Sequence, residues 1–248
     1  MMVRLCAFIM MFVSLSAQAD QIRVAVAANF KPILQTLSEQ FEKDTEHQVT
    51  VSSASTGVLY NQVVNGAPFD LFLSADSRRP QQLDDQGLVV KGSRTTYGYG
   101  ELVLWHNGNG RISLKDLKTY KGRLAIANPV TAPYGLAAQQ VLEKMSLWQG
   151  YQGRLIQGAS IQQTWQFVAS GNVELGLVAR SQMINPSYKE ADITLIPADQ
   201  YDPIQQDLVI LKRSKSLSAA QEFRTFLLSP ASQNYIASQG YLPAEVNH

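Results

Sequence analysis

The feature of this sequence that most constrains its fold is a regular alternation of short β-type runs and segments with helical periodicity. A first apolar run at 22–27 is followed by apolar residues at helical spacing over 30–41. A second run at 49–53 precedes a helical segment at 56–64. Strands that alternate with helices pair largely in parallel and carry helices on the faces of the sheet. The pattern therefore predicts an α/β fold.

The same alternation continues to the end of the chain. Further strands are expected at 69–73, 102–105, 124–127, 155–156, 175–178, 193–196 and 207–211. Further helices are expected at 136–145, 219–228 and 231–239, and after Ser160, which has capping-box spacing to Gln163. This pattern alone leaves open whether the elements form one sheet or two lobes.

Residues 1–19 are predicted to be a cleavable signal peptide. Arg4 gives a short basic start, and the apolar stretch at 5–15 is shorter than the roughly 20 residues that span a bilayer. Ala-Gln-Ala at 17–19 fits the small-residue motif of a cleavage site. The alternative is a buried N-terminal helix. Cleavage predicts a mature protein that is exported from the cytoplasm.

The charge of the chain is nearly balanced, with 21 Lys and Arg against 20 Asp and Glu. Nucleic acid and anionic membranes attract proteins that carry a basic field. Neither is therefore an expected partner of this protein.

Common catalytic and metal-binding motifs are missing from the sequence. Its three histidines, His47, His106 and His248, are scattered, and neither HExxH, GxSxG nor a phosphate-binding loop occurs. Its single cysteine lies in the predicted leader. No catalytic residue, direct metal ligand or cofactor is therefore expected, and a secreted hydrolase is the less favoured alternative.

Turns between strands and helices carry the positive signal for binding. They are Ala28-Asn29, Ser55-Thr56-Gly57, Ala132-Pro133-Tyr134 and Ser160-Ile161. Each would leave main-chain N–H groups free at the positive end of a helix dipole, at the carboxyl end of a strand. Together they would form an anion site without a cationic side chain. The alternative is that these residues only cap helices, as Asn29 is expected to do.

Several longer stretches form a recognisable set in a fixed order. The most specific are NGAPFDLFLSAD at 65–76 and AIANPVTAPYG at 125–135, and others are VAVAANF at 24–30, GASIQQTWQFVASGNVELGLVA at 158–179 and SQGYLPA at 238–244. Over nearly the whole mature chain, the sequence resembles the periplasmic molybdate-binding proteins of ABC importers. The resemblance implies a two-lobed type II periplasmic-binding-protein fold, with two mixed sheets flanked by helices and a ligand cleft between the lobes.

The resemblance also implies the division of the chain. The first lobe would comprise 20–98 plus 207–248, and the second lobe 99–206. The chain would cross between lobes near 97–105 and return near 202–211.

The function implied by the resemblance is capture of molybdate, and also of tungstate, for the membrane permease of an ABC importer. The protein would act in the periplasm as a monomer and catalyse no reaction. Another tetrahedral oxyanion, such as chromate, sulfate or phosphate, stays an alternative ligand.

Five binding positions carry over from the family. The resemblance implies ligand contacts by the main-chain N–H groups of Asn29, Tyr134 and Ile161 and by the Thr56 hydroxyl. Ala28 stands where the family usually has Ser or Thr, so one hydroxyl contact is lost there. Thr56 replaces the usual Ser and adds a methyl group to the pocket.

Three conspicuous side chains are expected to have structural roles. The family's later tyrosine contact is missing, because Ala179-Arg180 occupies its place. Arg180 is interpreted as a solvated or lobe-bridging residue, with an anion contact as the alternative. Asp76 is expected to cap a helix and Trp165 to pack in the core.

Overall fold

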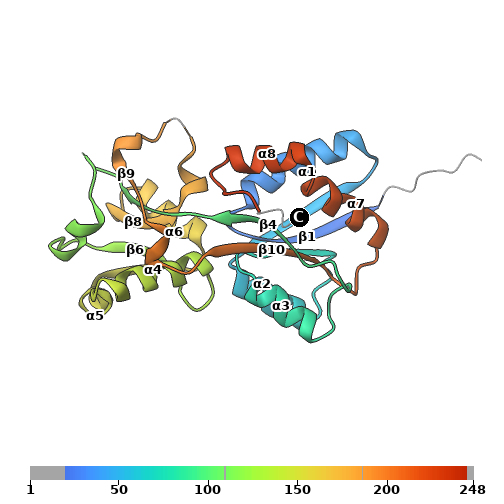
Figure 1. Cartoon of the computed structure of the whole chain (residues 1–248), viewed down its shortest axis with the longest axis horizontal. Coiled ribbons are helices and arrows are strands. Elements are labelled where there is room, and N and C mark those ends of the chain that lie inside the picture. The colour runs from blue at the N-terminus through green and yellow to red at the C-terminus, as the bar shows by residue number, and fades with distance from the viewer. Residues whose placement is uncertain (1–19, 109, 186, 245–248) are drawn as a thin grey trace, which may run out of the picture.

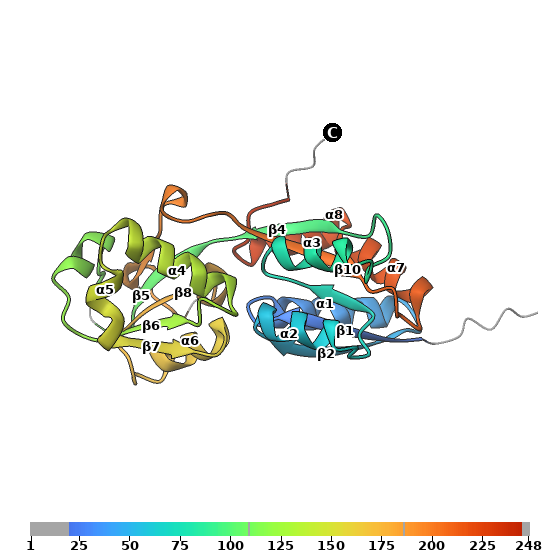
Figure 2. The ribbon, with the colours of Figure 1, turned by 90° about the horizontal axis from the view of Figure 1, so that it is seen from below.

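A computed structural model describes residues 20–108, 110–185 and 187–244 of the chain. The predicted signal peptide lies outside the described residues. Two sheets, each flanked by helices, form two lobes that lie next to each other (Figures 1 and 2). The prediction of an α/β fold with two mixed sheets is confirmed. Among the described residues, no helix is long and apolar enough to span a membrane.

The first lobe is built on a sheet with the strand order β2-β1-β3-β10-β4. Strand β1 is parallel to β2 and β3, whereas β10 is antiparallel to β3 and β4. The strands are β1 (Gln21–Ala27), β2 (Gln48–Ala54), β3 (Leu71–Leu73), β4 (Thr95–Gly100) and β10 (Ile204–Ile210). Strands β1 and β3 are nearly continuous apolar runs because helices cover both faces of the sheet.

Two apolar clusters divide the helices of the first lobe between the faces of its sheet. One cluster joins the sheet to α1 (Lys31–Asp44), α7 (Leu217–Leu227) and α8 (Pro230–Ser238). The other joins it to α2 (Thr56–Val64) and α3 (Arg78–Asp85) (Figure 1). The C-terminal helices thus pack on the lobe in which the described chain begins.

The second lobe repeats this plan with the strand order β7-β6-β8-β5-β9. Strand β6 is parallel to β7 and β8, and β5 is antiparallel to β8 and β9. The strands are β5 (Leu102–His106), β6 (Leu124–Ala127), β7 (Leu155–Gly158), β8 (Leu175–Ala179) and β9 (Ile193–Leu195). The helices are α4 (Pro133–Lys144), α5 (Trp148–Tyr151) and α6 (Ile161–Ala169). Short 3₁₀ turns lie at Leu114–Lys118, Gln152–Arg154, Arg180–Met183, Glu190–Asp192 and Ala198–Gln200.

Two extended segments connect the lobes. Strand β4 of the first sheet leads almost directly into β5 of the second, and the chain returns through β10 (Figure 2). The carboxyl ends of the parallel strands and the helices that follow them therefore face the junction between the lobes.

The structure differs from the local expectations in several places. Strand β4 and helices α3 and α5 were not expected from the sequence pattern, and β10 begins at Ile204 rather than at 207. Helix α1 is preceded by Phe30, so Asn29 does not cap it. The Asn29 side chain instead donates both of its amide N–H groups to buried side chains, those of Gln206 and Tyr241.

Candidate functional site

The structure brings all five predicted binding residues to the junction between the lobes. Each is at most 7% exposed. One cluster of contacting buried side chains contains Ala28 from the first lobe together with Tyr134 and Ile161 from the second. Asn29 and Thr56 lie beside Ala28, in the same turn and at the start of α2 respectively.

Strand pairing places the turns side by side within each lobe. In the first lobe, Ala27 at the end of β1 pairs with Ala54 at the end of β2. In the second lobe, Ala127 at the end of β6 pairs with Gly158 at the end of β7. Because these pairs are parallel, the turns after both strands emerge at the same edge of each sheet.

Four buried main-chain N–H groups at this junction have no hydrogen-bond acceptor within the residues that the structure describes. They belong to Asn29, Thr56, Tyr134 and Ile161. Buried N–H groups in folded proteins are nearly always paired. These four groups are therefore available to a ligand. The Ala28 N–H differs from them, because it donates to the Ala54 carbonyl oxygen at 3.0 Å.

The Thr56 hydroxyl has a fixed oxygen and a free proton. Its Oγ1 accepts the N–H of Ala75 at 3.1 Å. The next residue, Gly57, donates its N–H to the carbonyl oxygen of Thr131 in the opposite lobe at 2.8 Å. The start of α2 is thus held against the second lobe, with the Thr56 O–H able to donate to a ligand.

A buried glutamine connects the predicted site residues across the junction. Asn29 Nδ2 donates to Gln206 Oε1 at 2.9 Å and to Tyr241 Oη at 2.8 Å. Gln206 Nε2 in turn donates to Tyr134 Oη at 3.2 Å. Tyr97 Oη also donates to Gln206 Oε1, at 2.9 Å. The Asn29 side chain is therefore used to position its turn, and the Asn29 main chain is left for the ligand.

Local backbone features make room for this network. The register of β10 against β4 shifts between Gln206 and Asp207, and such an irregularity redirects the side chain at that point. A Cβ atom at Gly100 would overlap Tyr134 Oη and lie 2.8 Å from Gln206 Nε2. Sequence reasoning missed Gln206, for which the available signal was a polar residue at the start of an apolar strand.

Burial keeps the phenol groups of the network protonated. It raises the pKa of Tyr97 and of Tyr134 well above the usual value for tyrosine. Burial also raises the pKa of Tyr241 to about 12, although hydrogen bonds with Ser181 and Asn29 oppose the shift. Near neutral pH these three side chains are neutral.

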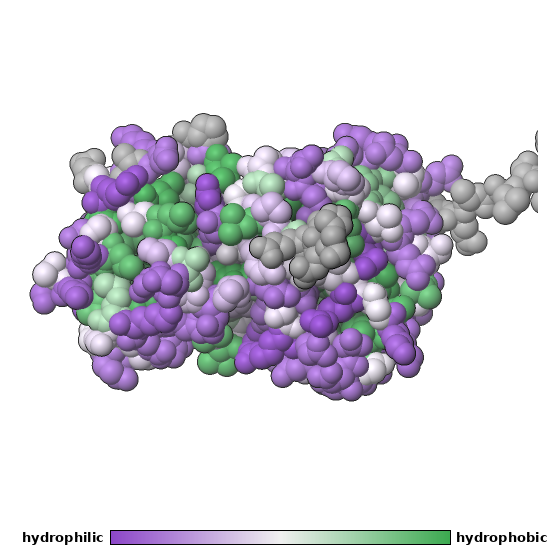
Figure 3. Space-filling view, viewed as in Figure 1, coloured by the Kyte–Doolittle hydropathy of each residue, from purple (hydrophilic) through white to green (hydrophobic). Residues whose placement is uncertain are grey.

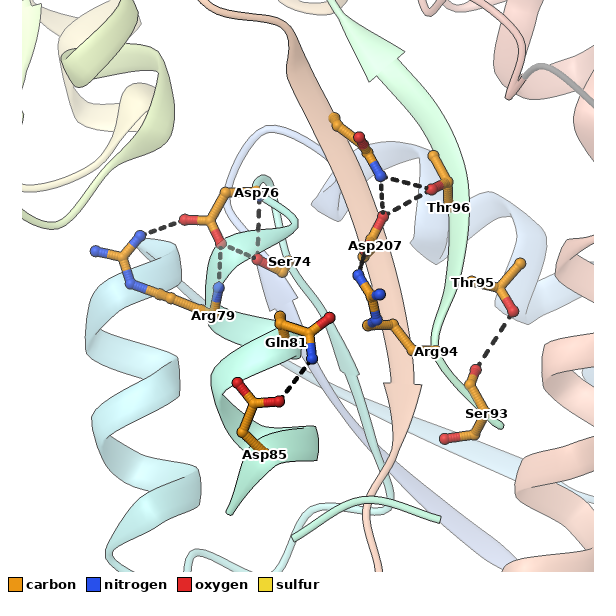
Figure 4. Close-up of polar contacts among 11 residues, drawn as sticks. Ser74, Asp76, Arg79, Gln81, Asp85, Ser93, Arg94, Thr95, Thr96 and Asp207 are labelled. Carbon is orange, nitrogen blue, oxygen red and sulfur yellow. Dashed lines mark hydrogen bonds and ion pairs between the residues drawn. The ribbon is translucent and has the colours of Figure 1, made fainter. Parts of the chain in front are cut away.

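Carboxylates close to the junction are paired with arginines (Figure 4). Asp76 Oδ1 accepts the main-chain N–H of Arg79 at 2.9 Å and so stabilises the first turn of α3, although the N-cap residue is Ser77 and not Asp76 as predicted. The Arg79 guanidinium forms an ion pair with Asp76 and donates to the Val130 carbonyl oxygen of the second lobe at 2.9 Å. Asp207 is buried and forms an ion pair with Arg94 at 3.0 Å. These pairs leave the junction close to electrically neutral.

The other two conspicuous side chains have contacts of their own in the second lobe. Arg180 is exposed and forms an ion pair with Glu101, in agreement with the interpretation of a solvated residue. Trp165 is half-buried and stacks on Trp105 with ring centroids 6.4 Å apart. It packs against the apolar cluster of the second lobe, as predicted.

Grooves on the surface lead to the junction. One of about 550 Å³ is lined by residues of both lobes, including Asn29, Gln162 and Ser181. Another, of about 340 Å³, contains Asp76, Arg79 and Pro133. Figure 3 shows hydrophilic residues over much of both lobes, with hydrophobic residues gathered in smaller patches. Within the described ranges, no group of three or more His, Cys, Asp or Glu residues is placed to hold a metal ion.

Comparisons with known proteins agree with this architecture. The model of the family described as bacterial extracellular solute-binding protein matches residues 22–242. The chain is 45% identical over 234 residues to the molybdate-binding protein ModA of Azotobacter vinelandii, and the alignment covers 91% of each chain. It is 39% identical to the ModA of Rhodobacter capsulatus, over 94% of this chain and 93% of the relative.

Similarity extends to three dimensions. The structure of the periplasmic molybdate-binding protein of Azotobacter vinelandii superimposes with a TM-score of 0.86 at 38% identity, covering 90% of this chain and 100% of that chain. This match confirms the expected periplasmic-binding-protein fold.

Proposed function

The chain belongs to the family of bacterial extracellular solute-binding proteins, and from this membership we propose that it captures molybdate, and also tungstate, for an ABC importer. The observation that carries the proposal is the set of four buried N–H groups, from Asn29, Thr56, Tyr134 and Ile161, that have no acceptor among the described residues. The site offers hydrogen-bond donors from both lobes to a ligand that has only acceptors.

The chemistry of the donors fits a fully deprotonated oxyanion. Main-chain N–H groups at the starts of helices stabilise an anion through their hydrogen bonds and through the positive end of the helix dipole. The Thr56 hydroxyl adds a fifth donor, because its oxygen already accepts the Ala75 N–H. A tetrahedral dianion can accept all five hydrogen bonds, so a cationic side chain is not needed.

Lobe closure would complete the site. The proposed donors lie on two lobes, for which we propose the bounds 20–98 plus 207–248 and 99–206. The connecting strands β4 and β10 of the first sheet extend two and three residues past these bounds. A ligand that contacts both lobes stabilises the closed form, and this shifts the equilibrium between open and closed molecules. Hydrogen bonds between Gly57 and Thr131 and between Arg79 and Val130 support a closed form of this kind.

The proposal extends to the role of the protein in the cell. It would work in the periplasm after removal of residues 1–19, as a monomer that delivers its ligand to the membrane permease. It would bind without catalysing a reaction and without a cofactor, since its ligand is the cargo itself.

A thermal-shift panel tests the proposal. The mature protein is heated with molybdate, tungstate, chromate, sulfate or phosphate at equal concentration and ionic strength. A ligand that binds only the folded state raises the melting temperature through mass action. Molybdate and tungstate are expected to give the largest shifts. The proposal is wrong if neither anion raises the melting temperature, or if sulfate or phosphate does so more strongly.

A further inference from the structure

The hydroxyl group of Ser55 is buried and unpaired. Its Oγ has no hydrogen-bond partner among the described residues, and Ser55 is 4% exposed. Buried hydroxyl groups in native proteins are usually hydrogen-bonded, and an unpaired one destabilises the folded state. Its position in the fold therefore needs an explanation.

Ser55 is the residue from which α2 starts, and it is the first residue of the predicted turn Ser55-Thr56-Gly57. A serine at this position normally accepts a main-chain N–H from the first turn of its helix with its side chain. Here the side chain makes no such bond, and the N–H of Gly57 is directed to Thr131 of the opposite lobe. The Ser55 hydroxyl therefore makes no capping bond, and it belongs to the turn whose next two residues, Thr56 and Gly57, contribute N–H groups to the junction.

Its neighbours belong to the candidate site. The following residue, Thr56, has one of the free N–H groups, and its hydroxyl oxygen is fixed by Ala75. The preceding residue, Ala54, accepts the N–H of Ala28 and so holds the turn that contains Asn29 beside Ser55. Like the free N–H groups, the Ser55 hydroxyl has no acceptor among the described residues, so its acceptor would have to come from a ligand.

We propose that Ser55 is a further ligand-binding residue, whose hydroxyl group donates a hydrogen bond to the captured oxyanion. This inference rests on the proposed function and adds a sixth donor to the site. It explains why a polar atom is buried without a partner, because the partner is an oxygen atom of the ligand. It also compensates for Ala28, where the sequence lacks the hydroxyl that the family usually has.

A second unpaired serine offers a matched control. Ser38 Oγ is also buried without a partner among the described residues, and Ser38 is 5% exposed. It lies within α1, more than two helical turns beyond Asn29 at about 3.6 residues per turn. Its position in the body of a helix does not bring it to the ends of the parallel strands.

The test compares Ser55→Ala with Ser38→Ala by two measurements, calorimetric titration with molybdate and thermal unfolding without ligand. Ser55→Ala is expected to weaken molybdate binding at least about tenfold, which corresponds to about 1.4 kcal/mol. Its ligand-free melting temperature should be unchanged or higher, because an unpaired buried hydroxyl is removed. Ser38→Ala should keep the affinity of the unmodified protein.

Ser55→Gly is a second variant for the case in which Ser55→Ala does not fold, since glycine is well accepted at the start of a helix. It should lose affinity like Ser55→Ala. The inference is overturned if the unmodified protein binds molybdate and the dissociation constants of both Ser55 variants lie within about twofold of its own. If the unmodified protein binds none of the five oxyanions, the proposed function fails and this inference fails with it.

Discussion

At the residue scale, side-chain atoms of the candidate site bond to other parts of the protein and fix its turns, and main-chain N–H groups stay free for the ligand. The Asn29 side chain uses both of its N–H groups for Gln206 and Tyr241, which leaves the Asn29 main-chain N–H for the ligand. The Thr56 oxygen is used by Ala75, which leaves the hydroxyl proton. Because these bonds hold the donors in place, the donor positions within each lobe are set before the lobes close on a ligand.

Thr56→Val is expected to weaken molybdate binding by about 1.5–3 kcal/mol, because it removes a hydrogen bond to a charged ligand while keeping the shape of the side chain. Thr56→Ser keeps the hydroxyl and should stay close to the unmodified protein. Calorimetry measures both affinities, and ligand-free melting temperatures report any loss of the bond to Ala75. Equal affinities for the Val and Ser variants would show that the Thr56 hydroxyl does not contact the anion.

At the scale of elements, the start of α2 and the loop before α4 contact each other across the junction between the lobes. Gly57 donates to Thr131, and Arg79 reaches from α3 to Val130. A Cβ atom at Gly57 would lie 3.0 Å from Arg79 Nη2, 3.0 Å from Thr131 Cα and 3.1 Å from Thr131 O. The contact is therefore close for any residue larger than glycine, and an added methyl group would have to displace Thr131 or Arg79 by a few tenths of an ångström.

Gly57→Ala should reduce molybdate affinity several-fold, because the added methyl group opposes closure of the lobes. The ligand-free stability should be unchanged or higher, since alanine favours helix more than glycine does, by up to about 1 kcal/mol. Gly150→Ala, which would meet nothing within 4 Å, is the control. Tight binding by the Gly57 variant would argue against closure through this contact.

Local sequence patterns were sufficient to predict most helices and strands. They failed for elements and contacts that depend on packing between residues far apart in the sequence. Strand β4 has glycines at 98 and 100, which weaken its strand signal. The buried residues of α3 are Arg79, Pro80 and Leu83, which do not form an apolar stripe. The turns of the site were predicted because strand ends and helix starts are local features. The Gln206 network was not, because Gln206 and Asn29 are 177 residues apart in the sequence.

At the scale of the whole molecule, the described charges close to the junction between the lobes are paired, and its buried phenols are neutral. Asp76 and Asp207 are neutralised by arginines, and the tyrosines at the junction are protonated because burial raises their pKa. A neutral junction of donors attracts an anion through hydrogen bonds whose strength does not depend on a titrating side chain.

The pH dependence of stability follows from the same tyrosines. The pKa of Tyr241 is about 12 when folded, against about 10 when unfolded, so its burial costs nothing below pH 10. Between about pH 10 and 12 the unfolded chain releases this proton first, and Tyr241 then lowers the free energy of unfolding by about 1.4 kcal/mol per pH unit. Urea unfolding should therefore show a decline above pH 10 that is shallower in Tyr241→Phe. An unchanged slope in this variant would contradict the assignment.

The central claim is that a site made only of hydrogen-bond donors selects a large, fully deprotonated oxyanion. Competition calorimetry against bound molybdate tests it most directly. Tungstate should compete about equally. Phosphate keeps a proton that would face donors at a cost of about 1–3 kcal/mol, and the smaller sulfate cannot reach donors on both lobes. Sulfate and phosphate should each bind at least about a hundredfold more weakly than molybdate, which corresponds to a loss of about 2.7 kcal/mol in binding free energy. Displacement of molybdate by equimolar sulfate or phosphate would contradict the claim.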